Sequence, residues 1–381
     1  MLRTDSRTGF DAEHELFRDS VRKFFARELV PNLSRWEADG NVDRSFWRSA
    51  GAAGLLCPTA PEALGGLGLN FRYNAIIGEE LAYAGSAAGI RLQSDIVVDY
   101  LVNYGSAQQK QQWVPQMISG EVIAAIAMTE PGAGSDLQNI RTAAIRDGDE
   151  YVISGVKTYI TNGRNADLVI VAVKTDAAAR GKGISLMLVE AERSGFSRGM
   201  KLDKIGQRSA DTCELFFDDV RIPVANRLGD EGGGFACLML QLPRERLSIA
   251  IGAQAAAQRA FDEALTYTQQ RPAFGKTVFD FQNTRFELAD MAANLQIGWA
   301  HVDWALERHI AGKLTAPEAC SAKLWHGEML WEICDRSLQL HGGAGYMNES
   351  PIARLWRDSR VYRIYGGTSE IMKEIIGRSL R

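Results

Sequence analysis

Residues 122–136 read VIAAIAMTEPGAGSD. The run before Thr129 is apolar, and the residues after it are a proline, glycines and small polar residues. An apolar run that ends in such residues predicts a β-strand leading into a loop with exposed backbone N–H groups. The sequence on either side of this stretch decides what kind of fold contains it.

The N-terminal side has helical periodicity. Between Phe10 and about Gly120, apolar residues recur at spacings of three and four, and Pro31 ends the first such run. Loop signals interrupt the pattern at Thr59–Pro61 and at the glycines of Gly65–Gly68. These features predict an α-helical N-terminal domain over residues 1–121.

The sequence that follows residues 122–136 has the pattern of short β-strands. Apolar or alternating runs are separated by turns such as Asp147–Asp149, and they cover Tyr151–Ile153, Leu168–Val173, Ile184–Val189 and Glu214–Phe217. No helix of crossover length lies between them, which disfavours a Rossmann-type parallel sheet. We predict an antiparallel β-barrel or sandwich over residues 122–234.

Helical periodicity returns after Gly232–Gly234, which is the best candidate for a linker. The predicted helices are Ile249–Leu265, Phe286–Ile310, Pro317–Leu340 and a short terminal helix from Ser369. They predict a C-terminal domain over residues 235–381 that resembles a four-helix bundle. The fold class is therefore α+β multidomain, with helices, a β domain and helices in that order.

Composition excludes several classes of function. The net charge is −4 and Lys and Arg form no dense run, which argues against a nucleic-acid partner. No apolar run approaches the roughly 20 residues of a membrane span, and Met1–Phe10 resembles neither a signal nor a transit peptide. We expect a cytoplasmic protein without membrane insertion.

The five scattered cysteines predict neither a disulfide nor a metal site.

The loop Met128–Asp136 has two readings on its own, a cofactor cradle or a sharp β-turn. The sequence lacks G-x-G-x-x-G and G-x-x-x-x-G-K-[ST] at helix entries, which disfavours nicotinamide and nucleoside triphosphate chemistry. A flavin is then the better candidate for a cofactor.

This loop resembles the flavin-binding signature of the acyl-CoA dehydrogenase family, and four further segments resemble family motifs in the family order. They are Lys157–Gly163, Arg271–Lys276, Gln339–Tyr346 and Arg363–Ile371. The resemblance covers the chain from about Phe10 to Arg378. It implies an enzyme that binds FAD and removes two hydrogens across the α and β carbons of an acyl-CoA thioester.

The resemblance also implies which residues contact FAD. Those expected from the same subunit are Met128, Thr129, Gly134, Ser135, Tyr159 and Thr161, with Tyr159 at a position where many members have tryptophan. Those expected to reach FAD from a neighbouring subunit are Arg271, Phe274, Gln282, Gln339, Gly342 and Gly343, and those expected at its adenylate part are Thr368 and Glu370. A composite site of this kind implies a homo-oligomer, and the family is usually a tetramer.

The catalytic base is where this chain departs from many family members. They carry a glutamate directly after the tyrosine of the C-terminal motif, and here that position is Gly366. The long-chain and isovaleryl-CoA branch instead carries its glutamate early in the first helix after the β domain, which matches Glu245. From the residues alone, a glutamate between Arg244 and Arg246 would be an ion-paired surface charge. The resemblance implies that Glu245 removes the α proton.

The expected substrate site combines this base with nearby backbone groups. By resemblance, the N–H of Gly366 polarises the thioester carbonyl and Arg246 lies near the CoA end of the substrate. The residues expected to bind the substrate are Ser135, Arg246, Tyr365, Gly366 and Gly367. The family's usual electron acceptor is an electron-transfer flavoprotein.

The substrate class rests on motif sequences that resemble those of the long-chain enzymes, and this resemblance favours a medium-to-long or branched acyl group. The segment Arg91–Asp95, near the family's acyl cavity, is unusually polar and either admits an unusual acyl group or faces water. His326 and His341 are expected in ordinary polar roles, and Asp218–Asp219 in a structural turn. The alternatives are an acyl-CoA oxidase that uses oxygen, a flavin monooxygenase without the base, and a non-catalytic acyl-CoA-binding protein.

Overall fold

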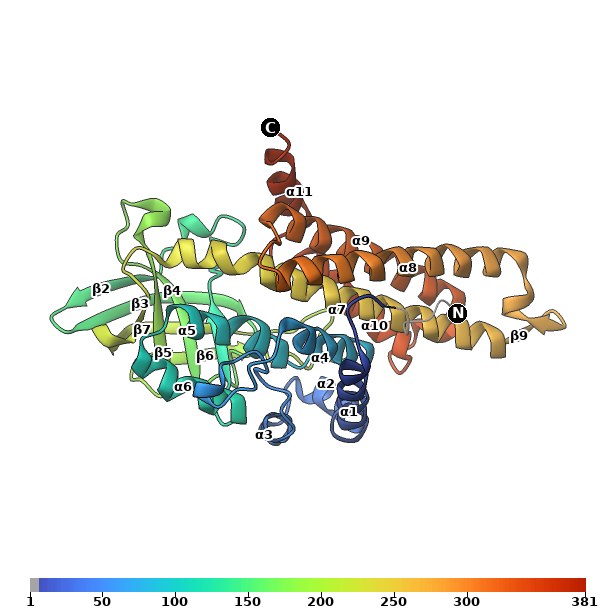
Figure 1. The fold of residues 1–381 in the computed structure, drawn as a ribbon, viewed down its shortest axis with the longest axis horizontal. Helices are drawn as coiled ribbons and strands as arrows, with labels where there is room; N and C mark the ends of the chain where they lie inside the picture. Colours follow the sequence, from blue (N-terminus) through green and yellow to red (C-terminus); the bar gives the residue numbers. More distant parts are fainter. Residues whose placement is uncertain (1–6) are drawn as a thin grey trace.

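The computed structural model describes residues 7–381 and has three parts, as the sequence predicts. Figure 1 shows the β domain at one end, the long C-terminal helices extending from it, and the N-terminal helices packed below both. Among the described residues, no helix is both long and apolar enough to cross a membrane.

Two of the N-terminal helices begin with capping boxes. Asp11 and Ser106 each accept a hydrogen bond from the third residue of the following helix, and that residue's side chain bonds back to the cap. The helices are α1 (Ala12–Glu28), α2 (Leu33–Asp39), α3 (Arg44–Ala52), α4 (Phe71–Tyr83), α5 (Val98–Tyr104) and α6 (Ala107–Ser119), with a π-helical segment at Leu92–Val97.

The π-helical segment settles one of the two expectations for the polar residues 91–95. Gln93, Ser94 and Asp95 are all buried, so the expectation that this stretch faces water is wrong. The amide of Gln93 satisfies backbone groups of the first strand region, including the N–H of Ala124 at 2.9 Å. The polar residues of this segment therefore serve interior contacts.

The middle part is one eight-stranded, sandwich-like sheet rather than a closed barrel. Its strands are β1 (Ala124–Ala127), β2 (Ala143–Asp147), β3 (Glu150–Ile160), β4 (Leu168–Lys174), β5 (Ile184–Glu190), β6 (Phe196–Lys201), β7 (Cys213–Pro223) and β8 (Arg227–Leu228). Most neighbours are antiparallel, as predicted, but β4 pairs in parallel with both β1 and β2. The turn predicted at Asp147–Asp149 connects β2 to β3.

Strand β4 shows why this part of the sequence is continuously apolar. Leu168, Ile170 and Ala172 pack into the core shared with the N-terminal helices, whereas the alternate residues pack into a second core inside the β domain. Both faces of β4 are buried because successive side chains of a strand point to opposite faces.

Asp218 and Asp219 lie within β7 instead of in the expected turn. The pairing of β3 with β7 shifts register beside them, and Asp219 has a left-handed φ of 50°. The hydroxyl of Ser154 donates to Asp219 at 2.7 Å across this bulge. The two acidic residues therefore mark a β-bulge.

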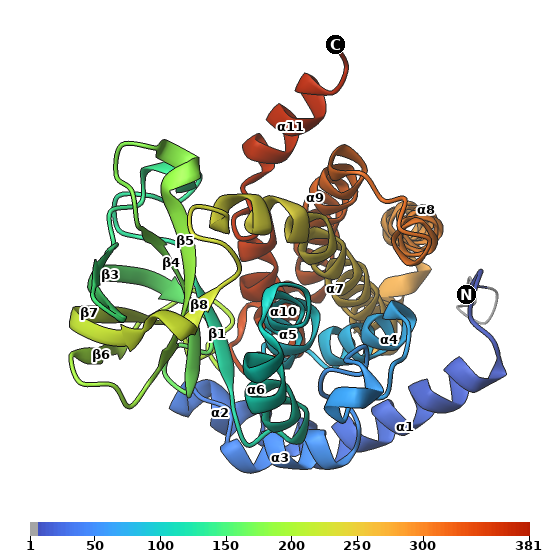
Figure 2. The same ribbon diagram turned by 60° about the vertical axis from the view of Figure 1, so that its left-hand side comes forward.

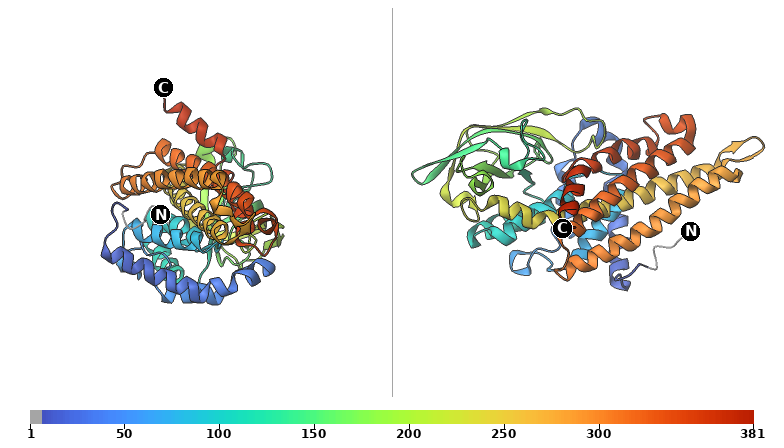
Figure 3. Two further views of the ribbon diagram at one scale, coloured as in Figure 1. Left: turned by 90° about the vertical axis from the view of Figure 1, so that its right-hand side faces the viewer. Right: turned by 90° about the horizontal axis from the view of Figure 1, so that it is seen from above.

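The C-terminal part is built around one helix that is longer than predicted. The expected helix at Ile249–Leu265 is part of α7 (Gly234–Gln270), which begins at the predicted linker and continues through Pro243. The other elements are the hairpin β9–β10 (Pro272–Ala273 and Lys276–Thr277), α8 (Gln282–Ile310), α9 (Ala316–His341), α10 (Pro351–Ser359) and α11 (Ser369–Arg378). Figures 2 and 3 show α7, α8 and α9 running alongside one another, and α11 projecting away from them.

Candidate active site

A cavity of about 460 Å³ lies where the three parts meet. It is within the size range of pockets that hold small molecules and cofactors. Eleven of the sequence-predicted site residues line it, from four separate segments of the chain: Met128, Thr129, Gly134, Ser135, Tyr159, Thr161, Glu245, Arg246, Tyr365, Gly366 and Gly367. The structure thus brings together the predicted base, the predicted flavin loop and the predicted substrate contacts.

The loop after β1 is held in place by a buried ion pair. Lys157 on β3 donates to the carboxylate of Glu130 at 2.9 Å and to the carbonyl of Met128 at 3.0 Å. The same carboxylate accepts the backbone N–H groups of Arg141 and Thr142. Burial lowers the pKa of Lys157 to about 8, although the nearby Glu130 raises it. These bonds fix the loop against β3 and the segment Arg141–Thr142. Other residues of the loop, including Gly134 and Ser135, line the cavity.

That face of the loop can take a planar cofactor. A Cβ added at Gly134 would meet no atom within 4 Å. Within residues 7–381, the backbone N–H groups of Gly134 and Ser135 have no protein acceptor, although both residues line the cavity. Open space beside unused N–H donors fits the ring oxygens and nitrogens of a flavin.

Tyr159 lines the cavity from the end of β3 and has a strained backbone. Its φ is 60°, which a tyrosine rarely adopts, and it lies where β3 shifts register against β7. The shift turns the ring outward, so that 68 % of Tyr159 is exposed at the cavity. An exposed aromatic ring at this position can stack on a flavin.

Glu245 is buried on α7, with 5 % of its surface exposed. Its Oε1 accepts a hydrogen bond of 2.9 Å from the hydroxyl of Tyr100 on α5. Burial raises the pKa of Glu245 to about 7, while the Tyr100 hydrogen bond and the charges of Arg246 and Arg244 oppose that rise. A carboxyl group with a pKa near neutrality is suited to take and release a proton.

The two arginines beside Glu245 point away from it, because adjacent residues of a helix do not face each other. Arg244 pairs with Asp99 and lies over the ring of Phe71, and Arg246 donates to the sulfur of Cys320 at 3.3 Å. Within residues 7–381, neither forms an ion pair with Glu245. The interpretation of Glu245 as an ion-paired surface charge is therefore wrong.

Gly366 lines the same cavity in a left-handed conformation with φ 64°. Its carbonyl accepts a hydrogen bond from Nε of Arg246 at 3.4 Å, and the carbonyl of Gly367 accepts one from Lys323 at 2.6 Å. The N–H of Gly366 has no acceptor within residues 7–381. An unused donor in the same cavity as a buried carboxylate can stabilise an enolate oxygen.

The other predicted cofactor residues lie outside this cavity. Arg271, Gln282, Gln339, Gly342 and Gly343 are exposed around the far ends of α7 and α9, and Phe274 on the β9–β10 hairpin is 95 % exposed. Figure 1 shows this hairpin at the end of the molecule away from the β domain. Thr368 caps α11 beside Gly367, and Glu370 is exposed. One copy of the chain therefore does not bring all the predicted FAD contacts together.

The structure adds residues that the sequence did not indicate. Tyr100 reaches Glu245 from 145 positions away, and nothing in its local sequence distinguishes it from the buried tyrosine of an amphipathic helix. Ile249, one turn after Glu245, lies against Gly366. His326 is fully buried against Gln254, and no cluster of three or more His, Cys, Asp or Glu able to share a metal is found in residues 7–381.

Comparisons with known proteins agree in every part of the chain. Three family profiles match: "Acyl-CoA dehydrogenase, N-terminal domain" over residues 11–121, "middle domain" over 125–220 and "C-terminal domain" over 232–381. The long-chain specific acyl-CoA dehydrogenase of Sus scrofa is 47 % identical over 374 residues, which cover 97 % of this chain and 87 % of the relative.

Two further relatives extend this match. The isovaleryl-CoA dehydrogenase of Oryza sativa subsp. japonica is 38 % identical, covering 97 % of this chain and 92 % of the relative. The crystal structure of an acyl-CoA dehydrogenase from Geobacillus kaustophilus superposes with a TM-score of 0.97 at 49 % identity, covering 98 % of this chain and all of that chain.

Proposed function

As a member of the acyl-CoA dehydrogenase family, the chain is an FAD-dependent oxidoreductase that dehydrogenates acyl-CoA thioesters, and we propose that Glu245 is its catalytic base. The observation that carries this proposal is the burial of Glu245 beside the flavin loop, with a pKa raised to about 7 and no ion pair within residues 7–381. A base must be ionised yet able to accept a proton near neutral pH, and Glu245 meets both conditions.

The residues around Glu245 divide the work of proton removal. The carboxylate takes the α proton of the thioester, and the N–H of Gly366 donates to the carbonyl oxygen on which charge develops. Arg246 holds the carbonyl of Gly366, which keeps that backbone in its left-handed conformation. FAD, when bound, accepts the hydride that leaves the β carbon. The product is the trans-2-enoyl-CoA.

We assign the remaining contacts by their position. Met128, Thr129, Gly134, Ser135, Tyr159 and Thr161 hold the flavin, and Tyr365 and Gly367 border the substrate with Ser135 and Arg246. Thr368 and Glu370 contact the adenylate part of FAD. The exposed set Arg271, Phe274, Gln282, Gln339, Gly342 and Gly343 completes the FAD site of a second copy, in a tetramer.

The substrate is a medium-to-long or branched acyl-CoA, and an electron-transfer flavoprotein accepts the electrons. The long-chain and isovaleryl-CoA enzymes among the relatives support this substrate class. Their names differ in acyl group, so the choice within the class depends on the side chains that line this chain's own cavity.

The decisive experiment follows flavin absorbance anaerobically while acyl-CoAs of increasing length and branching are added to the FAD-loaded enzyme. We expect wild type to bleach and Glu245→Gln to retain FAD without bleaching. Glu263→Gln, an exchange on the same helix outside the cavity, is the matched control and should bleach like wild type. A Glu245→Gln enzyme that bleaches at the wild-type rate would exclude Glu245 as the base.

The same FAD-loaded enzyme can be used to test which electron acceptor it uses. Rapid peroxide formation in air, without an electron-transfer flavoprotein, would identify an oxidase instead. If the wild-type enzyme carries FAD but none of the thioesters bleaches the flavin, the result would favour a non-catalytic acyl-CoA-binding protein.

A further inference from the structure

Arg91 places a guanidinium group on the wall of the same cavity that contains Glu245. It comes directly before the π-helical segment Leu92–Val97, and 17 % of its side chain is exposed. A charged group is costly beside an apolar acyl chain unless its donors are satisfied. Its surroundings therefore bear on which acyl group the cavity accepts.

Two helical glycines make room for this side chain. A Cβ at Gly252 on α7 would lie 2.1 Å from Nη1 of Arg91, and a Cβ at Gly78 on α4 would lie 3.0 Å from its Nε. Glycine inside a helix costs about 1 kcal/mol relative to alanine. The guanidinium explains why glycine stands at both positions, because any larger residue at Gly252 would displace it.

Protein acceptors satisfy only part of the guanidinium. Nη2 donates to the hydroxyl of Ser248 at 2.7 Å and also to the Ser248 carbonyl. Nε lies 3.5 Å from the Asp95 carboxylate, which itself accepts from Asn74 and Ser248, and this Nε has no hydrogen-bond partner. Nη1 also has no acceptor within residues 7–381. The charge is balanced by Asp95. Nε is enclosed by protein, so Nη1 is the donor that remains available to a ligand.

The position along α7 indicates which part of a substrate would meet this donor. Ser248 and Gly252 follow Glu245 by one and two turns, roughly 5 and 10 Å along the helix axis. The base must be at the α carbon of the substrate. Gly366, the proposed thioester contact, lies against Ile249, whereas the guanidinium extends to Gly252, about one turn further along α7. We therefore place the guanidinium on the tail side of the thioester.

We propose that Arg91 determines acyl specificity, selecting acyl-CoAs whose tail carries a hydrogen-bond-accepting oxygen, either a hydroxyl or a carboxylate, over plain alkyl chains of equal length. The inference rests on the proposed function. Such an oxygen would accept a hydrogen bond from Nη1, whereas a methyl terminus would bury that donor without a partner. A site that hydrogen-bonds one substrate group discriminates strongly against the analogue that lacks it.

The test measures binding separately from chemistry. Dissociation constants are determined calorimetrically on FAD-loaded Glu245→Gln enzyme, with and without Arg91→Met. The ligands are hexanoyl-, octanoyl- and decanoyl-CoA, their ω-hydroxy derivatives, and the mono-CoA thioesters of the matching dicarboxylic acids. The hydroxy and carboxy arms distinguish the two sources of oxygen.

We expect the better oxygenated series to bind about ten- to a hundred-fold tighter than the alkyl series, the range that a hydrogen bond to a charged group provides. Arg91→Met should remove this preference. Gly252→Ala, which displaces the guanidinium without removing it, should weaken the preference in the same direction. Arg259→Met is the matched control: Arg259 also forms an i,i+4 pair, with Glu263, but does not line the cavity.

Equal binding of alkyl and oxygenated chains, or a preference that survives Arg91→Met in enzyme with full FAD content, would overturn the inference. That result would leave Arg91 as a packing residue. Failure of the proposed function has a different signature, because wild type would then not bleach with any acyl-CoA, whatever its tail.

Discussion

The hydroxyl of Tyr100 donates a hydrogen bond to Oε1 of Glu245, and both side chains are buried. This bond favours the charged carboxylate and so opposes the effect of burial on the pKa of Glu245. Tyr100 thereby fixes the carboxylate of the proposed base and favours its ionised form.

Tyr100→Phe should move the pH dependence of catalysis upward. The carboxylate is the active form, so kcat/KM falls as pH decreases through the pKa of Glu245 near 7. Removing a hydrogen bond to a charged acceptor should raise that pKa by about one to two units. The measurement is a pH profile of kcat/KM for wild type and variant. Tyr104→Phe is the control, because Tyr104 bonds Gln241 instead of Glu245, and an equal shift there would refute the positioning role.

Gly366→Ala should slow the chemical step through a specific clash. The added Cβ would lie 2.3 Å from Cδ1 of Ile249, and the φ of 64° is unfavourable for alanine. Moving this backbone displaces the N–H proposed to polarise the thioester, and one lost donor of this kind costs roughly 3 kcal/mol or a hundred-fold in kcat. Single-turnover flavin reduction measures the effect. The double variant with Ile249→Val, which shortens the clashing side chain, should recover part of the loss, and no recovery would argue against this cause.

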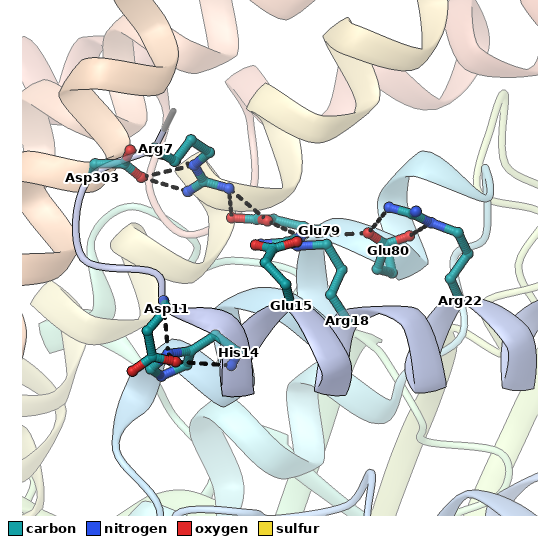
Figure 4. Close-up of polar contacts among 9 residues, drawn as sticks. All are labelled: Arg7, Asp11, His14, Glu15, Arg18, Arg22, Glu79, Glu80 and Asp303. Atoms are coloured by element: carbon teal, nitrogen blue, oxygen red, sulfur yellow. Dashed lines mark hydrogen bonds and ion pairs between the residues drawn. The ribbon is translucent and has the colours of Figure 1, made fainter. Parts of the chain in front are cut away.

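Arg7 should be a strong determinant of stability. Figure 4 shows its guanidinium between Glu79 on α4 and Asp303 on α8, with Arg18 and Arg22 of α1 extending the network through Glu79 and Glu80. All three central side chains are buried, so Arg7→Ala would leave Asp303 without an ion-pair partner among the described residues and Glu79 with Arg18 alone. We expect a loss of about 3–5 kcal/mol in the free energy of unfolding. Arg35→Ala, which breaks the exposed pair with Asp43, should cost less than about 1 kcal/mol under the same denaturant titration.

Phe274→Asp should separate assembly from folding. The ring is 95 % exposed on a hairpin whose φ values at Phe274 and Gly275 are both positive, so it contributes little to the core of its own chain. If this residue completes the FAD site of a second copy, the variant should lose FAD and shift to smaller assemblies. Sedimentation velocity and flavin content measure both effects. A variant with the wild-type assembly and full FAD content would contradict the composite site.

The sequence was sufficient for the three-part architecture because periodicity reports which faces are buried. It was insufficient for α7, where the alanine-rich segment after Ile249 carried the helical signal and the segment around Pro243 did not. A proline removes one backbone donor, yet α7 continues through Pro243, with Leu238 before it and Glu245–Ser248 after it buried. The start of α7 at Gly234 was therefore not evident from periodicity.

The site followed the same division. Glu245 and Gly366 were predicted from motifs, and the structure placed them on one cavity. Tyr100 was not predicted, because a hydrogen bond between α5 and α7 leaves no local pattern in either segment. The surroundings of Arg91 were only partly predictable. The polar segment 91–95 was evident from the sequence, but Gly78 and Gly252, which make room for the guanidinium, belong to two other helices.

Helix α7 has a mechanical consequence. Glu245 near its start and Arg271 at its end are joined by one continuous helix, roughly 39 Å long at the usual rise per residue. A continuous helix of this kind fixes the distance between the proposed base and the surface that we propose contacts a neighbouring copy. A substitution near Arg271 that rotated or shifted α7 would also move the carboxylate of Glu245. We therefore expect substitutions at the two ends of the helix to be coupled.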